Sequence, residues 1–409
     1  MDAHDTLAHF RERFYFPKTK DGRECIYLCG HSLGLQPKTA RSYIEEELQD
    51  WAQLGVEGHF HGKNPWMPYH RLLADQTAAL VGAQPTEVVV MNSLTVNLHL
   101  MMVSFYRPTA ERHKIVIERG AFPSDQYAVK SQILFHKFDP AQSLIELTPG
   151  EGESCLRDED IDALIEREGN SIALILLGGV NYATGQLLDM PAITRAGHRK
   201  GCIVGFDLAH AAGNVPLHLH EWGPDFAAWC SYKYLNGGPG CVAGCFVHDR
   251  HARAWGIPRF GGWWGHDEKT RFQMGPKFQP MHGAEGWQLS NPPIMALAPL
   301  RASMEIFTEA GMEALRAKSV ALTGYMEFLL KQKQFPKFQV ITPAAEDRRG
   351  AQLSIRLKHH GRDLCDRLTA DGVIGDWREP DTFRVAAVPL YNSYQDVYRF
   401  VERFEVTLS

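Results

Sequence analysis

The segment Ile203-Val-Gly-Phe-Asp-Leu-Ala-His210 is an apolar run that ends in an aspartate, and Trp229-Cys-Ser-Tyr-Lys-Tyr-Leu-Asn-Gly-Gly-Pro-Gly240 sets a lysine before a glycine-rich turn. A short apolar run bounded by polar residues is typical of a buried strand. In open α/β sheets, ligands bind at the carboxyl ends of the strands. The two segments therefore predict an α/β fold with a ligand site that holds Asp207 and Lys233.

Lys233 lies in chemically unusual surroundings for a lysine. Most lysines are solvated surface charges, but the preceding run Asp225-Phe-Ala-Ala-Trp-Cys-Ser-Tyr is apolar and aromatic, so Lys233 should be mostly buried and needs a partner. A buried lysine amine can form a Schiff base with an aldehyde, and an aspartate can keep a pyridine nitrogen protonated. Lys233 and Asp207 together predict pyridoxal 5'-phosphate as the cofactor and an amino acid as the substrate.

Apolar strands alternate with helices through the middle of the chain, which predicts a parallel sheet covered on both faces. The expected strands are Val88–Met91, Lys114–Glu118, Ile172–Leu177, Cys202–Phe206 and Val242–Val247. The expected helices include Pro37–Gly55, Asp158–Ile165 and Pro191–Lys200. A chain of 409 residues usually forms more than one domain.

The pattern changes near residue 292, where a long helical stretch begins and runs to about Lys333. Strand-like and helical segments then alternate, which predicts a smaller α+β domain; they are Phe338–Ile341, Gln352–Leu357, Asp363–Asp371, Thr382–Val388 and a terminal helix from Tyr394. We expect an N-terminal segment at 1–60, a large cofactor-binding domain at 61–291, and the long helix with the small domain at 292–409.

Composition excludes several classes of protein. The formal net charge is -5 and no run of five basic residues occurs, so nucleic-acid binding is not expected. No apolar stretch reaches the length of a membrane span, and no signal peptide is visible. The eight cysteines lack the spacing of a zinc site, as do the pairs His59/His61 and His218/His220, so no metal is expected. Reduced thiols point to the cytoplasm.

Further candidate residues follow predicted strands, and each also has a simpler interpretation. Thr95, in Asn92-Ser-Leu-Thr-Val-Asn97, can bind a phosphate at a helix start, although such a pattern is also an ordinary helix cap. In Phe122-Pro-Ser-Asp125, Phe122 can stack on a flat ring and Asp125 can place negative charge near that ring. The same four residues are also typical of a simple turn followed by a helix start. Arg384 sits among apolar residues, where it can bind a substrate carboxylate or form a structural salt bridge.

Eight motifs in this order resemble the kynureninase family over nearly the whole chain, from about Tyr27 to Phe400. They are Gly30-His-Ser-Leu-Gly-Leu-Gln-Pro37, Leu94-Thr-Val-Asn-Leu-His99, Ala121-Phe-Pro-Ser-Asp125, Gly205-Phe-Asp-Leu-Ala-His210, Trp229-Cys-Ser-Tyr-Lys-Tyr-Leu-Asn236, Gly262-Trp-Trp-Gly-His266, Leu289-Ser-Asn-Pro-Pro293 and Val388-Pro-Leu-Tyr-Asn392. The resemblance implies fold type I, in which a mainly parallel seven-stranded sheet covered by helices is joined to a smaller α+β C-terminal domain. It also implies a hydrolase that cleaves the Cβ–Cγ bond of L-kynurenine or 3-hydroxy-L-kynurenine.

The same resemblance implies roles for individual residues. Lys233, Tyr232 and Asp207 would be catalytic, with Tyr232 protonating the Cβ carbon. The cofactor would be held by Leu94, Thr95, Phe122, Pro123, Ser124, Asp125, Asp207, His210, Tyr232 and Lys233, with Trp263 and Asn291 coming from the second subunit of a homodimer. The substrate would be held by Arg384, His59, Ser290, Asn291 and Ser32, and His59, Ser290 and Asn291 match members that favour 3-hydroxykynurenine.

Two positions depart from the family pattern, and two rival functions stay open. Members often carry Asn at the position of His31 and a hydroxyl residue at that of Gly178, where its loss would remove a cofactor hydrogen bond. A cysteine desulfurase or an aminotransferase would share the fold, although the only cysteine in the C-terminal third, Cys365, falls within a predicted helix. A non-catalytic vitamin-B6-binding protein would not need Lys233, Asp207, Tyr232 and Arg384 together.

Overall fold

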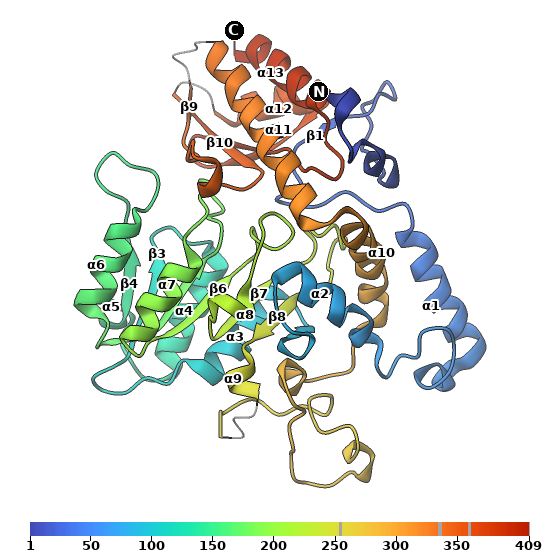
Figure 1. Ribbon diagram of the computed structural model, residues 1–409, viewed down its shortest axis with the longest axis vertical. Helices are drawn as coiled ribbons and strands as arrows, with labels where there is room; N and C mark the ends of the chain where they lie inside the picture. The colour runs from blue at the N-terminus through green and yellow to red at the C-terminus, as the bar shows by residue number, and fades with distance from the viewer. Residues whose placement is uncertain (253–255, 334–337, 359–360, 409) are drawn as a thin grey trace.

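The computed structural model describes residues 1–252, 256–333, 338–358 and 361–408. Its centre is a seven-stranded sheet in the order β2-β8-β7-β6-β5-β3-β4 (Figure 1). The strands are β2 (Val88–Val90), β3 (Lys114–Glu118), β4 (Leu144–Leu147), β5 (Ile172–Gly178), β6 (Ile203–Asp207), β7 (Phe226–Trp229) and β8 (Gly244–Val247). Strand β8 runs antiparallel to both of its neighbours, β2 and β7, and the other neighbouring pairs are parallel, so the predicted mainly parallel sheet is confirmed.

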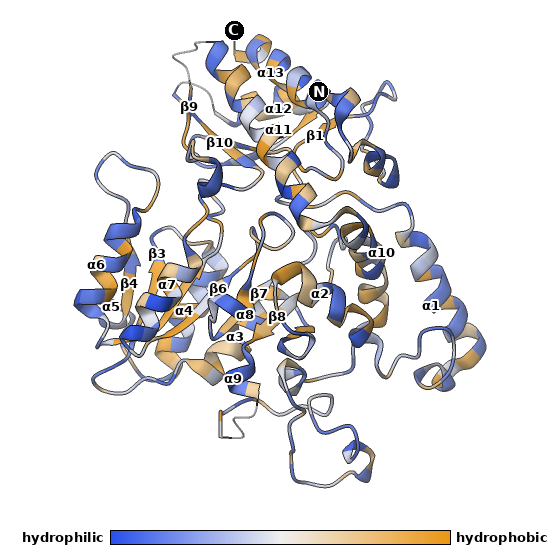
Figure 2. Cartoon of the chain, viewed as in Figure 1, coloured by the Kyte–Doolittle hydropathy of each residue, from blue (hydrophilic) through white to orange (hydrophobic). Residues whose placement is uncertain are grey.

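Both faces of the large sheet are buried, and Figure 2 shows much of the sheet in the orange of apolar residues. Successive residues of a strand point to opposite faces. Ile115 and Ile117 of β3 join one core with Leu98 and Met101, whereas Val116 joins a second core with Ile161. The sheet is therefore held between two apolar layers, which explains why its strands are continuous apolar runs rather than alternating ones.

Helices supply these two layers and the outer parts of the chain. They are α1 (Ala40–Leu54), α2 (Ala74–Val81), α3 (Leu94–Phe105), α4 (Pro123–Phe135), α5 (Pro140–Ser143), α6 (Asp158–Glu168), α7 (Met190–Arg199), α8 (Leu219–Trp222), α9 (Asp249–Ala252), α10 (Ile294–Ala310), α11 (Met312–Gln332), α12 (Arg362–Ala370) and α13 (Tyr394–Leu408). The single helical stretch expected from residue 292 to about 333 is in fact two helices. The break falls at Gly311, whose φ of 73° is a conformation that favours glycine.

The C-terminal part contains a separate antiparallel sheet in the order β12-β13-β10-β9. Its strands are β9 (Phe338–Val340), β10 (Gln352–Leu357), β12 (Asp376–Arg378) and β13 (Thr382–Ala386). Helices α11, α12 and α13 cover it, as Figure 1 shows at the top of the molecule. Phe383, Phe400 and Phe404 contribute to this third core.

The N-terminal residues make several contacts with this C-terminal part. Strand β1 (Ile26–Tyr27) pairs with β11 (Val373–Ile374), and Arg11 forms an ion pair of 2.6 Å with Asp396. Helix α1 then packs against α10. None of the helices in the described ranges is both long and apolar enough to cross a membrane.

Candidate active site

A cavity of about 180 Å³ opens where β3, β5 and β6 end and where α3 and α4 begin. This is the edge of a parallel sheet at which ligands are expected. The cavity brings together nine of the residues singled out from the sequence: Leu94, Thr95, Phe122, Ser124, Asp125, Asp207, His210, Tyr232 and Lys233. The motifs lie far apart along the chain, so their convergence comes from the sheet topology.

Lys233 follows β7 and is half-buried in this cavity. Its Nζ lies 3.1 Å from Nε2 of His210 and 6.0 Å from the centre of the Phe122 ring. Burial, together with the nearby charge of Lys233, holds the pKa of His210 well below its usual range. His210 is therefore a neutral imidazole that can accept a hydrogen bond from the lysine ammonium through Nε2.

Asp125 and Asp207 form a pair of carboxyl groups at the cavity wall. Burial and the adjacent, hydrogen-bonded Asp207 raise the pKa of Asp125, because two such carboxylates cannot easily both be charged. Asp207 Oδ1 also accepts a hydrogen bond of 2.7 Å from the backbone N–H of Ala209, which fixes the orientation of its carboxylate.

Glu118, at the end of β3, is a third acid in the cavity, and its importance was missed in the sequence. Its carboxylate accepts hydrogen bonds from the backbone N–H of Gly178, at 2.9 Å, and from Asn181. Burial raises the pKa of Glu118, while these two hydrogen bonds oppose that shift. Its place at the carboxyl end of a strand is the signal that would have identified it.

The start of α3 provides the other end of the cavity. Its first residues, Leu94 and Thr95, line the cavity, and the Ser93 side chain makes no capping hydrogen bond. Thr95 Oγ1 lies 2.7 Å from Ser124 Oγ, which brings two hydroxyls together. Free backbone N–H groups at a helix N-terminus beside two hydroxyls form a suitable site for a phosphate. The simpler interpretation of this segment, a side-chain helix cap, is not what the structure shows.

Arg384 is buried in β13 and does not line the cavity wall. Its Nη1 donates to the carbonyl of Tyr182 at 2.5 Å, and Nη2 contacts the carboxylate of Asp376. The antiparallel register pairs Arg384 directly with Asp376. The structural salt bridge, which was the alternative role for Arg384, is thus present. The cavity is nevertheless close to Arg384, because Tyr182, whose carbonyl accepts from Nη1, lines the cavity.

The remaining candidates lie outside the walls of this cavity, as far as the described residues define them. Trp263, Ser290 and Asn291 are exposed, and His59 is half-buried, with its ring 5.3 Å from that of Trp66. Ser32 is half-buried in the turn after β1, and its backbone N–H donates to the carbonyl of Cys29. Pro123 begins α4. Within one chain, these residues therefore do not form part of the described cavity lining.

The cavity fits pyridoxal phosphate on three counts. The buried acid pair suits a protonated ring nitrogen, the start of α3 suits a phosphate, and Lys233 offers an amine for the aldehyde. The buried Nδ1 of His210 also has no hydrogen-bond partner among the described residues. The fold and this cavity define a fold-type-I pyridoxal-phosphate enzyme.

Comparison with known proteins agrees with this class and narrows it. Residues 315–404 match the family described as kynureninase C-terminal domain. The chain is 68% identical over its full length to a kynureninase from Koribacter versatilis, covering 96% of that protein, and 60% identical to one from Myxococcus xanthus, over 99% of this chain and 95% of that protein. The chain belongs to the kynureninase family, and it is a pyridoxal-phosphate-dependent hydrolase of carbon–carbon bonds.

Solved structures show the same fold at much lower sequence identity. The cysteine desulfurase CsdA from Escherichia coli superposes with a TM-score of 0.78 at 18% identity, covering 98% of each chain. A cysteine desulfurase from Thermococcus onnurineus gives 0.76 at 16% identity, covering 93% of this chain and 94% of that one. The fold-type-I assignment made from the sequence is confirmed.

Proposed function

We propose that the Lys233 cavity carries out the hydrolytic cleavage of the Cβ–Cγ bond of L-kynurenine or 3-hydroxy-L-kynurenine. The products are L-alanine and anthranilate or 3-hydroxyanthranilate. The observation that supports this most directly is the meeting of Lys233, His210 and the Asp125–Asp207 pair in one cavity. When bound, pyridoxal phosphate supplies an aldehyde for the substrate amine and a ring that accepts electrons.

Lys233 is the proposed base that takes the proton from the substrate Cα. A base must lie within hydrogen-bond reach of its proton and must be able to lose its own. Neutral His210, whose Nε2 lies 3.1 Å from the lysine Nζ, can accept a hydrogen bond from that nitrogen and orient it. The half-buried position of Lys233 limits the access of water to the amine.

Asp207 is the proposed partner of the ring nitrogen. Its carboxylate is fixed by the Ala209 N–H and is buried beside Asp125. A cation placed against this pair would favour the ionised form of the carboxyl groups. Asp125 thus adds negative charge next to the residue that holds the nitrogen proton.

Tyr232 is the proposed acid that protonates the Cβ carbon after water has added to the γ-carbonyl of the substrate and the Cβ–Cγ bond has broken. Burial raises the pKa of its phenol, so the group keeps its proton until a strongly basic carbon is present. Arg384 is the proposed partner of the substrate α-carboxylate. The carboxylate would take the place of the Tyr182 carbonyl as the acceptor of the Arg384 Nη1 hydrogen bond.

The proposal includes a homodimer with shared active sites in the cytoplasm. It is supported by the exposure of Trp263 and Asn291, which the family resemblance assigns to the second subunit's side of the cofactor site. The eight cysteines, all in the described ranges, form no disulfide, which suits a reducing compartment.

Mixing Lys233→Ala and Asn291→Ala subunits tests whether each active site is built from two subunits. An equimolar mixture should recover about a quarter of the wild-type activity, because about half of the dimers are mixed and each mixed dimer has one of its two sites intact; no recovery would place each site within one chain.

The pocket for the aryl ring is proposed to contain His59, Ser290 and Asn291 and to favour the 3-hydroxy substrate. A polar pocket that hydrogen-bonds a hydroxyl discriminates against the analogue that lacks it. The test is the ratio of kcat/KM for the two substrates, with products identified by chromatography. Faster cleavage of plain kynurenine would keep the reaction but reject this pocket. Failure to cleave either substrate with the cofactor bound would reject the proposed function.

A further inference from the structure

His31 is a fully buried histidine in the turn after β1. Neither of its ring nitrogens has a hydrogen-bond partner among the described residues. Its Nε2 lies 3.7 Å from Asp376 Oδ2, which is too long for a hydrogen bond. Native proteins rarely leave buried polar groups unpaired because each one costs free energy. The imidazole of His31 is therefore a buried polar group whose hydrogen-bonding capacity is not used within the described part of the chain.

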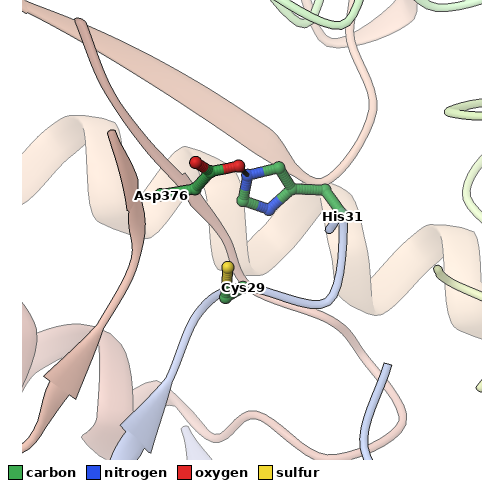
Figure 3. Close-up of side chains that lie close together, drawn as sticks. All are labelled: Cys29, His31 and Asp376. Atoms are coloured by element: carbon green, nitrogen blue, oxygen red, sulfur yellow. Dashed lines mark ion pairs between the residues drawn. The ribbon is translucent and has the colours of Figure 1, made fainter. Parts of the chain in front are cut away.

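The surroundings of His31 identify the charge of that partner. Burial lowers the pKa of His31, and the cationic groups of Arg384, Lys233 and Arg378 lower it further, so the ring is neutral. Figure 3 shows His31 together with Asp376 and Cys29, a set of residue types that can bind metals. However, Asp376 already contacts both Arg384 and Arg378, and two guanidinium groups oppose a metal cation there. An excess of positive charge favours an anion.

The donors available at this point match a carboxylate. Arg384 uses Nη1 and Nη2 within the chain, but its buried Nε has no hydrogen-bond partner among the described residues. A neutral imidazole has one N–H to donate. The Arg384 guanidinium and the His31 imidazole therefore hold free donors in a buried region of net positive charge, and a carboxylate has two oxygens that can accept from both.

We propose that His31 is a second residue, beside Arg384, that binds the α-carboxylate of the substrate by donating a hydrogen bond from its ring. This rests on the proposed function, since it concerns the same substrate. His31 acts on binding and orientation, and it moves no proton in the reaction. The side-chain amide of Asn has a comparable N–H donor, so an Asn at this position should do the same work, whereas an apolar residue of similar size should not.

The experiment uses the holoenzyme and its variants His31→Leu and His31→Asn, with calorimetric titration of L-alanine, the product that carries the α-carboxylate. Loss of a hydrogen bond to a charged group predicts a Kd for L-alanine about tenfold to a hundredfold higher in His31→Leu. KM for L-kynurenine should rise similarly. His31→Asn should recover affinity to within about threefold of wild type. Titration of anthranilate, which probes the aryl end, should give an unchanged Kd in all three proteins, and the absorbance of the bound cofactor should not change.

Three results would overturn the inference. An unchanged Kd for L-alanine in His31→Leu would mean that His31 only fills space or binds water. Equal weakening of L-alanine and anthranilate would mean general damage to the pocket. Weaker binding of pyridoxal phosphate would assign His31 to the cofactor. A wild-type enzyme that binds L-alanine through His31 but fails to cleave L-kynurenine would reject the proposed function alone.

Discussion

Gly178 offers the sharpest test of how the cavity is built, because a Cβ at this position would lie 3.0 Å from Oε1 of Glu118. The same oxygen accepts the Gly178 N–H at 2.9 Å, and the second oxygen accepts from Asn181. An alanine at 178 would push the buried Glu118 carboxylate away from its two hydrogen-bond donors, the backbone N–H of residue 178 and the Asn181 side chain. The glycine at this position thus leaves room for the Glu118 carboxylate.

The size of the effect follows from two opposing contributions. A hydrogen bond to a charged group contributes roughly 1.5–3 kcal/mol, and glycine within a strand is less favourable than alanine by roughly 0.5–1 kcal/mol. Gly178→Ala should therefore destabilise the protein by about 1–2 kcal/mol. In Glu118→Ala the obstructing oxygen is absent, so adding Gly178→Ala should be neutral or slightly stabilising.

The assay is thermal unfolding of the four proteins of this double-mutant cycle, as holoenzymes at one protein concentration. Gly178→Ala should lower Tm by about 1–2 °C in the wild-type background and by none in the Glu118→Ala background. An equal drop in both backgrounds, or a higher Tm for Gly178→Ala alone, would refute the reasoning. Glu118→Gln serves as the matched control, because its side chain has the same shape next to residue 178 but carries no charge.

Two further variants test separate parts of the structure. Lys233→Ala should keep its far-ultraviolet circular dichroism but lose the absorbance of the lysine-bound cofactor; unchanged absorbance and activity would sink the assignment of Lys233. Burial would raise the pKa of Asp225, but hydrogen bonds from His198 and His251 and the charge of Arg250 together lower it. Because the folded-state pKa is depressed, the stability that Asp225 contributes is fully present above its unfolded pKa of about 3.9 and is lost progressively as the pH falls from there toward the lower folded-state pKa. Asp225→Asn should therefore lower Tm at pH 7 and flatten the fall of Tm between about pH 5 and pH 3; parallel pH curves for the two proteins would contradict this.

Much of the cavity was predictable because each of its motifs follows an apolar strand. Asp207 ends β6, Phe122 and Asp125 follow β3, and Thr95 follows β2. The carboxyl ends of parallel strands meet at one edge of a sheet, so local sequence was enough to bring these residues together. Lys233 follows the short strand β7, which the sequence showed only as an apolar segment.

Features that depend on long-range pairing could not be read from the sequence. The ion pair of Arg384 with Asp376 arises from the register of β12 with β13, and β12 was not among the expected strands. The complete burial of His31 depends on the packing of the N-terminal segment against the C-terminal part. Trp263 and Asn291 carry family motifs, but their distance from the cavity in one chain appears only in the structure.

The most direct test of the account is to identify the products of the purified holoenzyme given L-kynurenine and, in a parallel reaction, L-cysteine. The account predicts L-alanine and anthranilate in equal amounts from L-kynurenine, and no sulfur release from L-cysteine. Cys365 supports the second expectation, because it lies half-buried in α12 and burial raises the pKa of its thiol. Alanine and sulfur from L-cysteine without cleavage of L-kynurenine would contradict the account and place the enzyme with the desulfurases that share its fold.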